Sequence, residues 1–421
     1  MKLALLIALM VGLAAAENWV VIVSGSNTYS NYRHQANICH TYHIMKSRGI
    51  PDDHIITMTY DDVPNHTENP FPGKLYNRND GPDVNEGCQK DYIGDECTPA
   101  AFMAVLKGDS AAVGGKKVLK STKDDKVFIV YTDHGNKGLV SMPEHQALYA
   151  DELNEALVYM YEHKMYDQLV FYLGACLSGS MFDNGKLRDD MNIYAMTSAH
   201  GNENGYAALC PPVGDKVRGK YIGACLSDQF TIAWQDDTKE DSSNSRTFQE
   251  QYEFVKSQLT SQAQQFGDLS WTDKKITDFM GRNKSKAPKA VFEELFQFQR
   301  HRPDTQTGMP VNEVDAPLVH LYSRVIQNGG ERAQLAFMEE LNDRLRVDHV
   351  FKHFDRSVGT EGQSTKDIDF TCYKQLVNHY IQHCDALTDY SFSKLERLSE
   401  ACNTNKTVDQ LKEALTASCA H

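Results

Sequence analysis

Two apolar, β-branched runs of this chain each end in a reactive side chain. The run that begins at Lys126 ends at His134, and the run that begins at Gln168 ends at Cys176. In an α/β sheet, binding sites form in the crevice at the carboxyl ends of parallel strands. Two neighbouring strands that end in this way would place a thiol beside an imidazole, which is the arrangement that activates a cysteine nucleophile.

The residues around these two runs favour that interpretation. Residues 150–163 have the apolar spacing of an amphipathic helix, and a strand–helix–strand unit makes its two strands parallel. Gly135 and Gly179 allow backbone N–H groups to approach a substrate carbonyl. Taken singly, such a histidine is usually a core or surface residue and such a cysteine an inert buried thiol. The pair together predicts nucleophilic catalysis by Cys176 and His134.

Length and charge limit the class of protein. The 421 residues are enough for two or three domains and a large core. Acidic residues outnumber basic ones by 57 to 43, which gives a net charge of −14 and no basic surface for nucleic acid. Residues 114–117 lack the spacing of a phosphate-binding loop, and the Cys39, His40 and His43 cluster has no second group of zinc ligands. We expect no metal and no cofactor.

The first 16 residues read as a signal peptide. Lys2 is followed by an apolar stretch and then by three alanines, and no later stretch is long enough to span a bilayer. We therefore expect a soluble protein of the secretory pathway, either secreted or delivered to a lysosome, vacuole or endosome. Three glycosylation triplets, which mark exposed positions, begin at Asn65, Asn283 and Asn405.

Strand and helix patterns alternate as far as about residue 200, which predicts an α/β fold with a mainly parallel sheet covered by helices on both faces. The expected strands are 19–24, 53–60, 126–134, 168–176 and 192–198, and the expected helices are 33–49, 100–107, 150–163 and 247–266. Prolines are frequent in 284–317, which reads as a linker, and helical spacing prevails from Leu318 onward. We divide the chain into a signal peptide (1–16), a catalytic domain (17–285), a linker or activation segment (286–328) and a helical domain (329–421).

Secretion permits disulfides, and the chain has ten cysteines. Four of them in the helical domain predict two bridges, for which three pairings are possible: Cys372, Cys384, Cys402 and Cys419. We expect Cys39 to be a buried thiol and Cys88 to pair with Cys97. Cys176, Cys210 and Cys225 remain without an assigned partner.

Several motifs, in their order and spacing, resemble the legumains, the asparaginyl endopeptidases among the caspase-like cysteine peptidases. The motifs that carry the likeness are Ser26-Asn27, Asn31–Ala36, Tyr60–Asp62, Tyr131–Gly135 and Ala175–Met181. The resemblance covers nearly the whole chain, including the C-terminal cysteines. It implies a caspase-like catalytic domain followed by an all-helical prodomain.

The resemblance also implies roles for individual residues. Cys176 would be the nucleophile, His134 the general base and acid, and Asn31 the residue that orients the histidine. Backbone N–H groups of Gly135 and Cys176 would form the oxyanion hole. Arg33 and His34 would line the pocket for the side chain before the scissile bond, the P1 side chain.

For the C-terminal region, the resemblance implies disulfides Cys372–Cys402 and Cys384–Cys419. It also implies that the helical domain covers the cleft of a proenzyme at neutral pH. Acidification would loosen that contact, and the enzyme would then cut itself near Asn328. The expected partners are protein and peptide substrates, the chain's own prodomain as inhibitor, and cystatin-type inhibitors.

The chain departs from the legumain pattern around the P1 pocket. Gly174, Gly205 and Ala224 stand where legumains have polar or acidic side chains, and Leu177 replaces an acid after the nucleophile. An asparagine amide needs both donors and acceptors, whereas the remaining Arg33 prefers a carboxylate. We therefore expect Asp at P1 to be cleaved at least as well as Asn. Two alternatives stay open, a catalytically weak peptide-binding protein and a peptide ligase.

Overall fold

The computed structural model describes residues 16–283, 308–360 and 367–420. Its centre is a six-stranded sheet in the order β13-β8-β7-β3-β1-β2. The strands are β1 (Asn18–Ser24), β2 (Ile55–Met58), β3 (Lys126–Thr132), β7 (Gln168–Gly174), β8 (Ile193–Thr197) and β13 (Gln264–Gly267). All pairings are parallel except that of β13 with β8, which is antiparallel. The predicted α/β class and mainly parallel sheet are confirmed.

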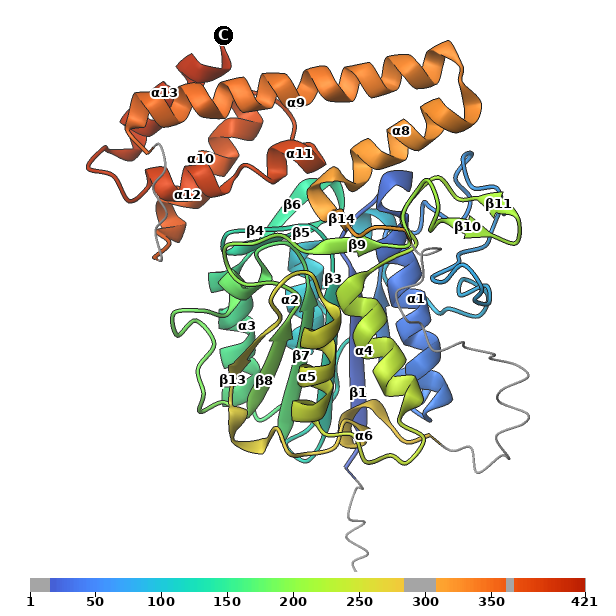
Figure 1. Ribbon diagram of the computed structural model, residues 1–421. Helices are drawn as coiled ribbons and strands as arrows, with labels where there is room; N and C mark the ends of the chain where they lie inside the picture. Colours follow the sequence, from blue (N-terminus) through green and yellow to red (C-terminus); the bar gives the residue numbers. More distant parts are fainter. Residues whose placement is uncertain (1–15, 284–307, 361–366, 421) are drawn as a thin grey trace, which may run out of the picture.

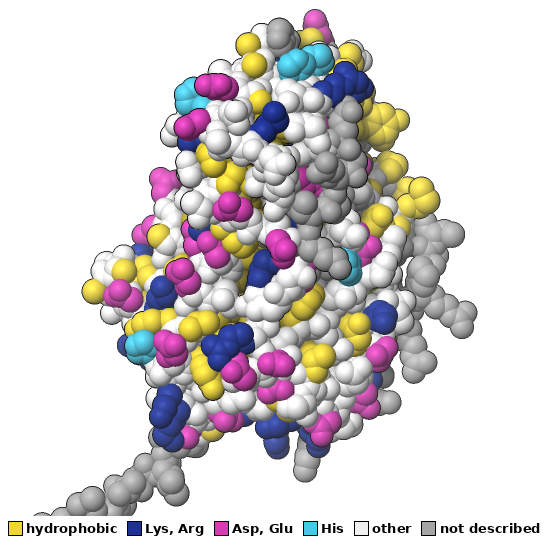
Figure 2. Space-filling view, turned by 90° about the vertical axis from the view of Figure 1, so that its left-hand side faces the viewer, with side chains coloured by type: hydrophobic (Ala, Val, Ile, Leu, Met, Phe, Trp, Pro, Cys, Tyr) yellow, Lys and Arg dark blue, Asp and Glu magenta, His cyan; other side chains and the backbone are white. Residues whose placement is uncertain are grey.

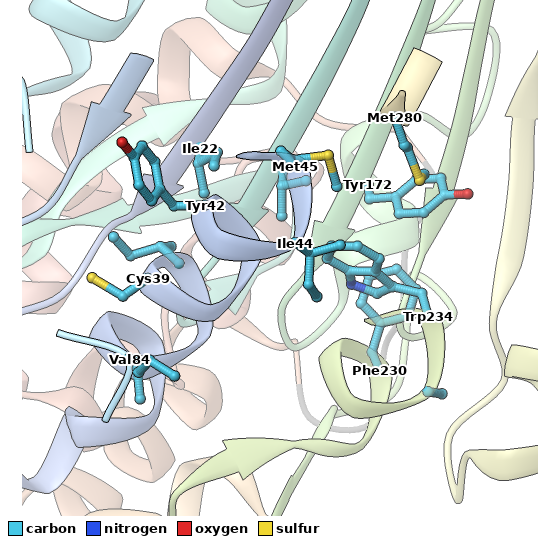
Figure 3. Close-up of a cluster of buried hydrophobic side chains, with 14 of the residues drawn as sticks. Ile22, Cys39, Tyr42, Ile44, Met45, Val84, Tyr172, Phe230, Trp234 and Met280 are labelled. Atoms are coloured by element: carbon cyan, nitrogen blue, oxygen red, sulfur yellow. The ribbon is translucent and has the colours of Figure 1, made fainter. Parts of the chain in front are cut away.

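Helices cover both faces of this sheet (Figure 1). One face carries α1 (Tyr32–Ser47), α4 (Gln229–Glu240), α5 (Phe248–Gln258) and α6 (Thr277–Met280), and the other carries α2 (Pro99–Leu106) and α3 (Ala150–Glu162). Side chains alternate along each strand, so Val20 and Ile22 enter one core while Val21 and Val23 enter the other. Figure 3 shows part of the first core, where Met45 of α1 and Trp234 of α4 lie close to Tyr172 of β7.

Shorter strands extend from the ends of the main sheet. A three-stranded antiparallel sheet follows His134 and consists of β4 (Gly135–Asn136), β5 (Leu139–Met142) and β6 (Gln146–Tyr149). A second one consists of β9 (Tyr206–Ala208), β12 (Ser227–Asp228) and β14 (Val311–Asn312), and a hairpin joins β10 (Lys216–Val217) to β11 (Lys220–Tyr221). Both three-stranded sheets lie at the end of the main sheet where β3 and β7 terminate (Figure 1).

The C-terminal region is helical and lies across that same end of the sheet (Figure 1). Its helices are α8 (Ala316–Asn328), α9 (Glu331–Val358), α10 (Phe370–His383), α11 (Asp389–Phe392), α12 (Glu396–Ala401) and α13 (Val408–Cys419). The disulfides Cys372–Cys402 and Cys384–Cys419 join these helices, as predicted. Leu139 and Tyr149 of the catalytic domain pack into the core of this region, so the two parts share an apolar contact.

The other cysteines pair differently from our expectation. Cys39 forms a disulfide with Cys88, and Cys210 forms one with Cys225, while Cys97 is a buried free thiol. The expected Cys88–Cys97 bridge and the expected free thiol at Cys39 were therefore wrong. The reason is tertiary, because the loop that carries Cys88 packs against α1, which brings two residues 49 positions apart into contact.

The structure also corrects several predicted elements. The helix expected over 247–266 ends at Gln258, and residues 264–267 form the edge strand β13 instead. Helix α4 and the strands β4 to β6 were not predicted, because short or polar elements carry little periodicity of their own. Much of the predicted linker lies outside the described residues, and its last 13 residues form α8.

Within the described ranges, no helix is both long enough and apolar enough to cross a membrane. The face shown in Figure 2 carries acidic and basic side chains interspersed with one another. Of the predicted signal peptide, residues 1–15 lie outside the described residues.

Candidate active site

The sheet register places His134 and Cys176 side by side. Thr132 of β3 is the direct partner of Gly174 of β7. His134 follows Thr132 by two residues, and Cys176 follows Gly174 by two residues. Both side chains are buried, at 4% and 2% exposure. Gly135 packs so closely here that a Cβ atom would lie 2.2 Å from the carbonyl oxygen of Cys176, so only glycine fits. The predicted pairing of thiol and imidazole strands is thus present.

Asn31 fixes the orientation of the histidine. Its Oδ1 lies 2.8 Å from Nε2 of His134, and its Nδ2 donates to the carbonyl of Asn27. Since an amide oxygen only accepts hydrogen bonds, Nε2 carries the imidazole proton. The other nitrogen, Nδ1, is then left with the lone pair that a general base needs to accept a thiol proton.

In this state both reactive groups are neutral. Burial, together with the nearby charge of Glu313, raises the pKa of Cys176 well above its ordinary value. Burial lowers the pKa of His134 to about 4. The thiolate and imidazolium forms are therefore both disfavoured while the site is covered.

Arg33 and His34 occupy the first turn of α1 and are buried beside the site. Nη1 of Arg33 donates to Oδ1 of Asn31, whereas Nε and Nη2 have no hydrogen-bond partner among the described residues. His34 lies with Nδ1 2.6 Å from Oγ of Ser26 and 3.2 Å from Oδ1 of Asp133. Burial lowers the pKa of His34 well below its ordinary value, so Arg33 is the cation of this region.

The three positions where the chain departs from the legumain pattern have different surroundings. A Cβ atom at Gly205 would lie within 2.9 to 3.0 Å of the Glu313 carboxyl group. One at Gly174 would contact Phe230, and Ala224 is part of the hydrophobic core. Gly205 is therefore the position that bears directly on the space beside Cys176.

Sequence reasoning missed an acid near Arg33. Asp228, at the N-cap of α4, is buried and accepts hydrogen bonds from Thr231 and Asn37. Burial raises its pKa, and the charge of Arg33 lowers it in part. Asp228 therefore supplies a carboxyl group near Arg33, although Gly174 and Ala224 provide none.

A segment of the chain itself lies against Cys176. Strand β14 adds to β9 in antiparallel register, with Val311 opposite Ala207, and the N–H of Glu313 donates to the carbonyl of Gly205 over 3.1 Å. The Cys176 thiol donates to Oε2 of Glu313, with the two atoms 3.6 Å apart. Extended peptides often bind to proteins by adding a strand to a sheet edge in this way.

The C-terminal helices contact His134. Oδ2 of Asp389, at the start of α11, accepts a hydrogen bond from Nδ2 of Asn31, and Oδ1 lies 3.4 Å from Nε2 of His134. Burial opposes ionisation of Asp389, yet His134, His145 and Asn31 together lower its pKa below the ordinary value. Nearby, Nδ2 of Asn136 donates to the carbonyl of Phe392. Nothing in the local sequence links Asp389 to a histidine more than 250 positions earlier.

Ligand-type atoms of His34, Asp133 and His134 lie within 4.8 Å of one another. Burial raises the pKa of Asp133 well above its ordinary value, which disfavours the carboxylate that a metal ion would need as a ligand. Nε2 of His134 is also engaged by Asn31. The arrangement serves acid–base chemistry better than metal binding.

The remaining predicted sites lie at the surface or at helix ends. Asn65 and Asn405 are exposed and Asn283 is partly exposed, as a glycosylation site requires. Asn328 is the last residue of α8, followed by Gly329 in the left-handed conformation with φ of 56°. Modification of the first three and cutting at the fourth stay predictions.

Comparison with known proteins agrees with this geometry. Residues 18–282 match the peptidase C13 family, and residues 338–419 match the legumain prodomain. The chain is 35% identical to the vacuolar-processing enzyme delta-isozyme of Arabidopsis thaliana, over 97% of this chain and 91% of that protein. It is 34% identical to the legumain of Mus musculus, over 96% and 92%.

A crystal structure of caspase-1 from Spodoptera frugiperda aligns with 64% of this chain and 92% of its own, at 10% identity and a TM-score of 0.38. The matches to the legumain relatives extend over the catalytic domain, the segment that contacts Cys176 and the disulfide-bonded helices alike. The chain belongs to the peptidase C13 family, the legumains, and is a cysteine endopeptidase with a legumain prodomain.

Proposed function

We propose that this protein cleaves peptide bonds after Asn and Asp, and that it is made as a precursor that matures in an acidic compartment of the secretory pathway, such as a lysosome or vacuole. The observation that carries the proposal is the seating of β14 on β9, which holds an extended peptide against Cys176. In the reaction, Nδ1 of His134 would take the thiol proton, and the thiolate would attack the carbonyl carbon of the P1 residue. The N–H groups of Gly135 and Cys176 would bind the developing oxyanion.

Two contacts support inhibition by the chain's own C-terminal part. Glu313 occupies the space beside the thiol, and Asp389 engages Asn31 and His134. A substrate cannot reach Cys176 while these contacts persist. Removing Glu313 would also take away a negative charge that raises the pKa of the Cys176 thiol, so release would favour the reactive thiolate.

A contact between the catalytic domain and α8 supports release of the C-terminal region in acid. Burial alone would raise the pKa of Glu68, but the hydrogen bond and charges of His320 and Arg324, both on α8, lower it below its ordinary 4.5. A carboxylate with a lowered pKa stabilises the closed state above its ordinary pKa, and this contribution is lost as pH falls through the lowered value. The contact therefore weakens only below about pH 4.5.

Glu313 has the opposite pH dependence. Burial, offset in part by Arg33, raises its pKa to about 7. Its docking is favoured in the protonated state, fully so below 4.5, and weakens as pH rises through about 7. Opening in acid must therefore come from contacts such as that of Glu68. These contacts have to overcome Glu313, whose docking is itself favoured in acid.

Arg33 supports cleavage after Asp as well as after Asn. Its Nε and Nη2 lie on one edge of the guanidinium group, which is the edge that binds a carboxylate through two hydrogen bonds. Asp228 would repel such a carboxylate when ionised, but burial raises its pKa and so reduces that repulsion in acid. We therefore expect Asp at P1 to be cleaved at least as well as Asn.

Matched peptides that differ only at P1, with Asn, Asp or Ala, test this proposal after acid activation, from about pH 4 to pH 7. Cleavage of Asn and Asp peptides well above the Ala peptide is the expected result. No cleavage of any peptide by protein with an intact Cys176 would favour the alternative of a peptide-binding protein. Release of joined peptides when an amine nucleophile is added would indicate a ligase. Binding of a cystatin-type inhibitor is a further expectation for the mature enzyme.

A further inference from the structure

The segment that contacts Cys176 places the carboxyl group of a glutamate against the thiol. Asn312 pairs with Tyr206, and the next residue, Glu313, donates its N–H to the carbonyl of Gly205. Its carboxyl group reaches the thiol of Cys176. Glu313 is 3% exposed, so the protein encloses this side chain almost completely.

Gly205 makes room for that side chain. A Cβ atom there would lie 2.9 Å from Oε1 and 3.0 Å from both Cδ and Oε2 of Glu313. A side chain at Gly205 would therefore require the Glu313 carboxyl group to shift. An aspartate or asparagine side chain is one methylene group shorter and does not extend as far. The absence of a side chain at Gly205 thus matters most for a long P1 residue.

The charges near Glu313 also fit a glutamate. Arg33 is fully buried, its Nε and Nη2 have no partner among the described residues, and its charge lowers the pKa of the Glu313 carboxyl. Asp228 acts in the opposite direction but is itself held by Thr231 and Asn37. The site therefore combines space for a long side chain with donors that suit a carboxyl group.

We propose that the pocket beside Cys176 accepts glutamate, so that the enzyme cleaves after Glu as well as after shorter side chains, and that Gly205 is the residue that determines this. The inference rests on the proposed peptidase activity. In the reaction, Cys176 forms a thioester with the glutamyl carbonyl carbon and the amine leaves with a proton from His134. Water then hydrolyses the thioester, which restores the thiol and leaves a C-terminal glutamate.

The test compares kcat/KM of the acid-activated enzyme on matched peptides with Glu, Gln, Asp, Asn or Ala at P1. We expect the Glu peptide to be cleaved within about tenfold of the Asp peptide, since one methylene group in a pocket changes kcat/KM by roughly 10- to 200-fold when it does not fit. In the Gly205→Ser and Gly205→Ala variants, the Glu-to-Asp ratio of kcat/KM should fall at least tenfold. The inference would be overturned if the enzyme cleaved the Asp or Asn peptides but cleaved the Glu peptide no faster than the Ala peptide. It would also be overturned if the Gly205 substitutions lowered kcat/KM equally on all peptides.

A second measurement does not need peptidase activity. In the full-length protein at neutral pH, Gly205→Ser should push Glu313 out of its position and increase the rate at which iodoacetamide labels Cys176. In a Glu313→Ala background the same substitution should have no further effect, because the clash is gone. If no peptide is cleaved, the proposed function fails. The labelling rates of the Gly205→Ser, Glu313→Ala and double variants then test by themselves whether Gly205 makes room for a glutamate side chain. Additive effects of the two substitutions would overturn the inference.

Discussion

Asp389 offers a direct test of how the C-terminal region closes the site. Its carboxylate accepts a hydrogen bond from Nδ2 of Asn31 at 3.1 Å, and His134 lies within ion-pair distance. The pKa of Asp389 is lowered although the group is buried, so the surroundings favour the carboxylate over its neutral form. The charged group therefore stabilises the closed state at neutral pH, and Asp389→Ala should open it.

The size of the effect follows from the contact. A hydrogen bond to a charged group contributes ~1.5–3 kcal/mol, and each 1.4 kcal/mol is a factor of ten. Asp389→Ala should therefore increase the open fraction about 10- to 150-fold. Asp389→Asn keeps an acceptor of the same shape but loses the charge. Because charge-assisted bonds are about twice as strong as neutral ones, about fivefold is expected for that variant.

The assay is the rate of Cys176 alkylation in the full-length protein at pH 7, read by mass spectrometry of the labelled peptide. The substitution lies outside the catalytic domain, so the open form has the same intrinsic thiol reactivity in each variant. Asp385→Asn is the matched control, because Asp385 lies nearby and pairs with Arg346 at the surface, where both side chains are nearly half exposed. Such exposed pairs contribute ~0–1 kcal/mol.

We expect the control to stay within a few-fold of the unaltered protein. An increase of twofold or less for Asp389→Ala would refute the reasoning, since the closed state would then be held by other contacts. Equal increases for Asp389→Ala and Asp385→Asn would also refute it, because a local contact with the catalytic residues could not explain both.

Three further outcomes are expected. Cys176→Ala should abolish peptide cleavage and self-processing without unfolding the protein, and turnover above that of a His134→Ala control would contradict its role as nucleophile. Glu68→Gln should raise Cys176 labelling a few-fold at pH 5–6, and the effect should shrink as the pH falls further below 4.5 and Glu68 itself becomes protonated; an effect that does not depend on pH would show that charge is not the cause. Replacing Cys39 and Cys88 by Ser should destabilise the catalytic domain by about 4 kcal/mol and lower its melting temperature, and an unchanged value would argue against the bridge.

The central sheet and the reactive pair were predictable because their signals are local. The runs ending at His134 and Cys176 are continuous and apolar, as buried parallel strands require, and the helix between them has a clear amphipathic period. These features fix both strands as parallel neighbours and their ends at one edge of the sheet. Asn31 could be assigned only through the family resemblance, since no local pattern marks an asparagine as the partner of a histidine.

Other features depend on contacts between distant residues. The Cys39–Cys88 bridge depends on how a long loop folds over α1, which cysteine spacing does not encode. Asp228 is an ordinary helix N-cap in the sequence, and only the folded chain brings it near Arg33. Residues 264–267 have no strand pattern of their own, yet the free edge of β8 pairs with them.

The sequence by itself determined the chemistry that this protein can perform, because a strand that ends in a cysteine beside a strand that ends in a histidine leaves few other uses for the pair. Only the tertiary structure decided whether the thiol and the imidazole are covered or open to a substrate. Glu313 and Asp389 lie 137 and 213 residues after Cys176 along the chain, and each is an unremarkable surface-type acid in the sequence. Their burial against the thiol and the imidazole arises from packing between domains, which local sequence patterns do not specify.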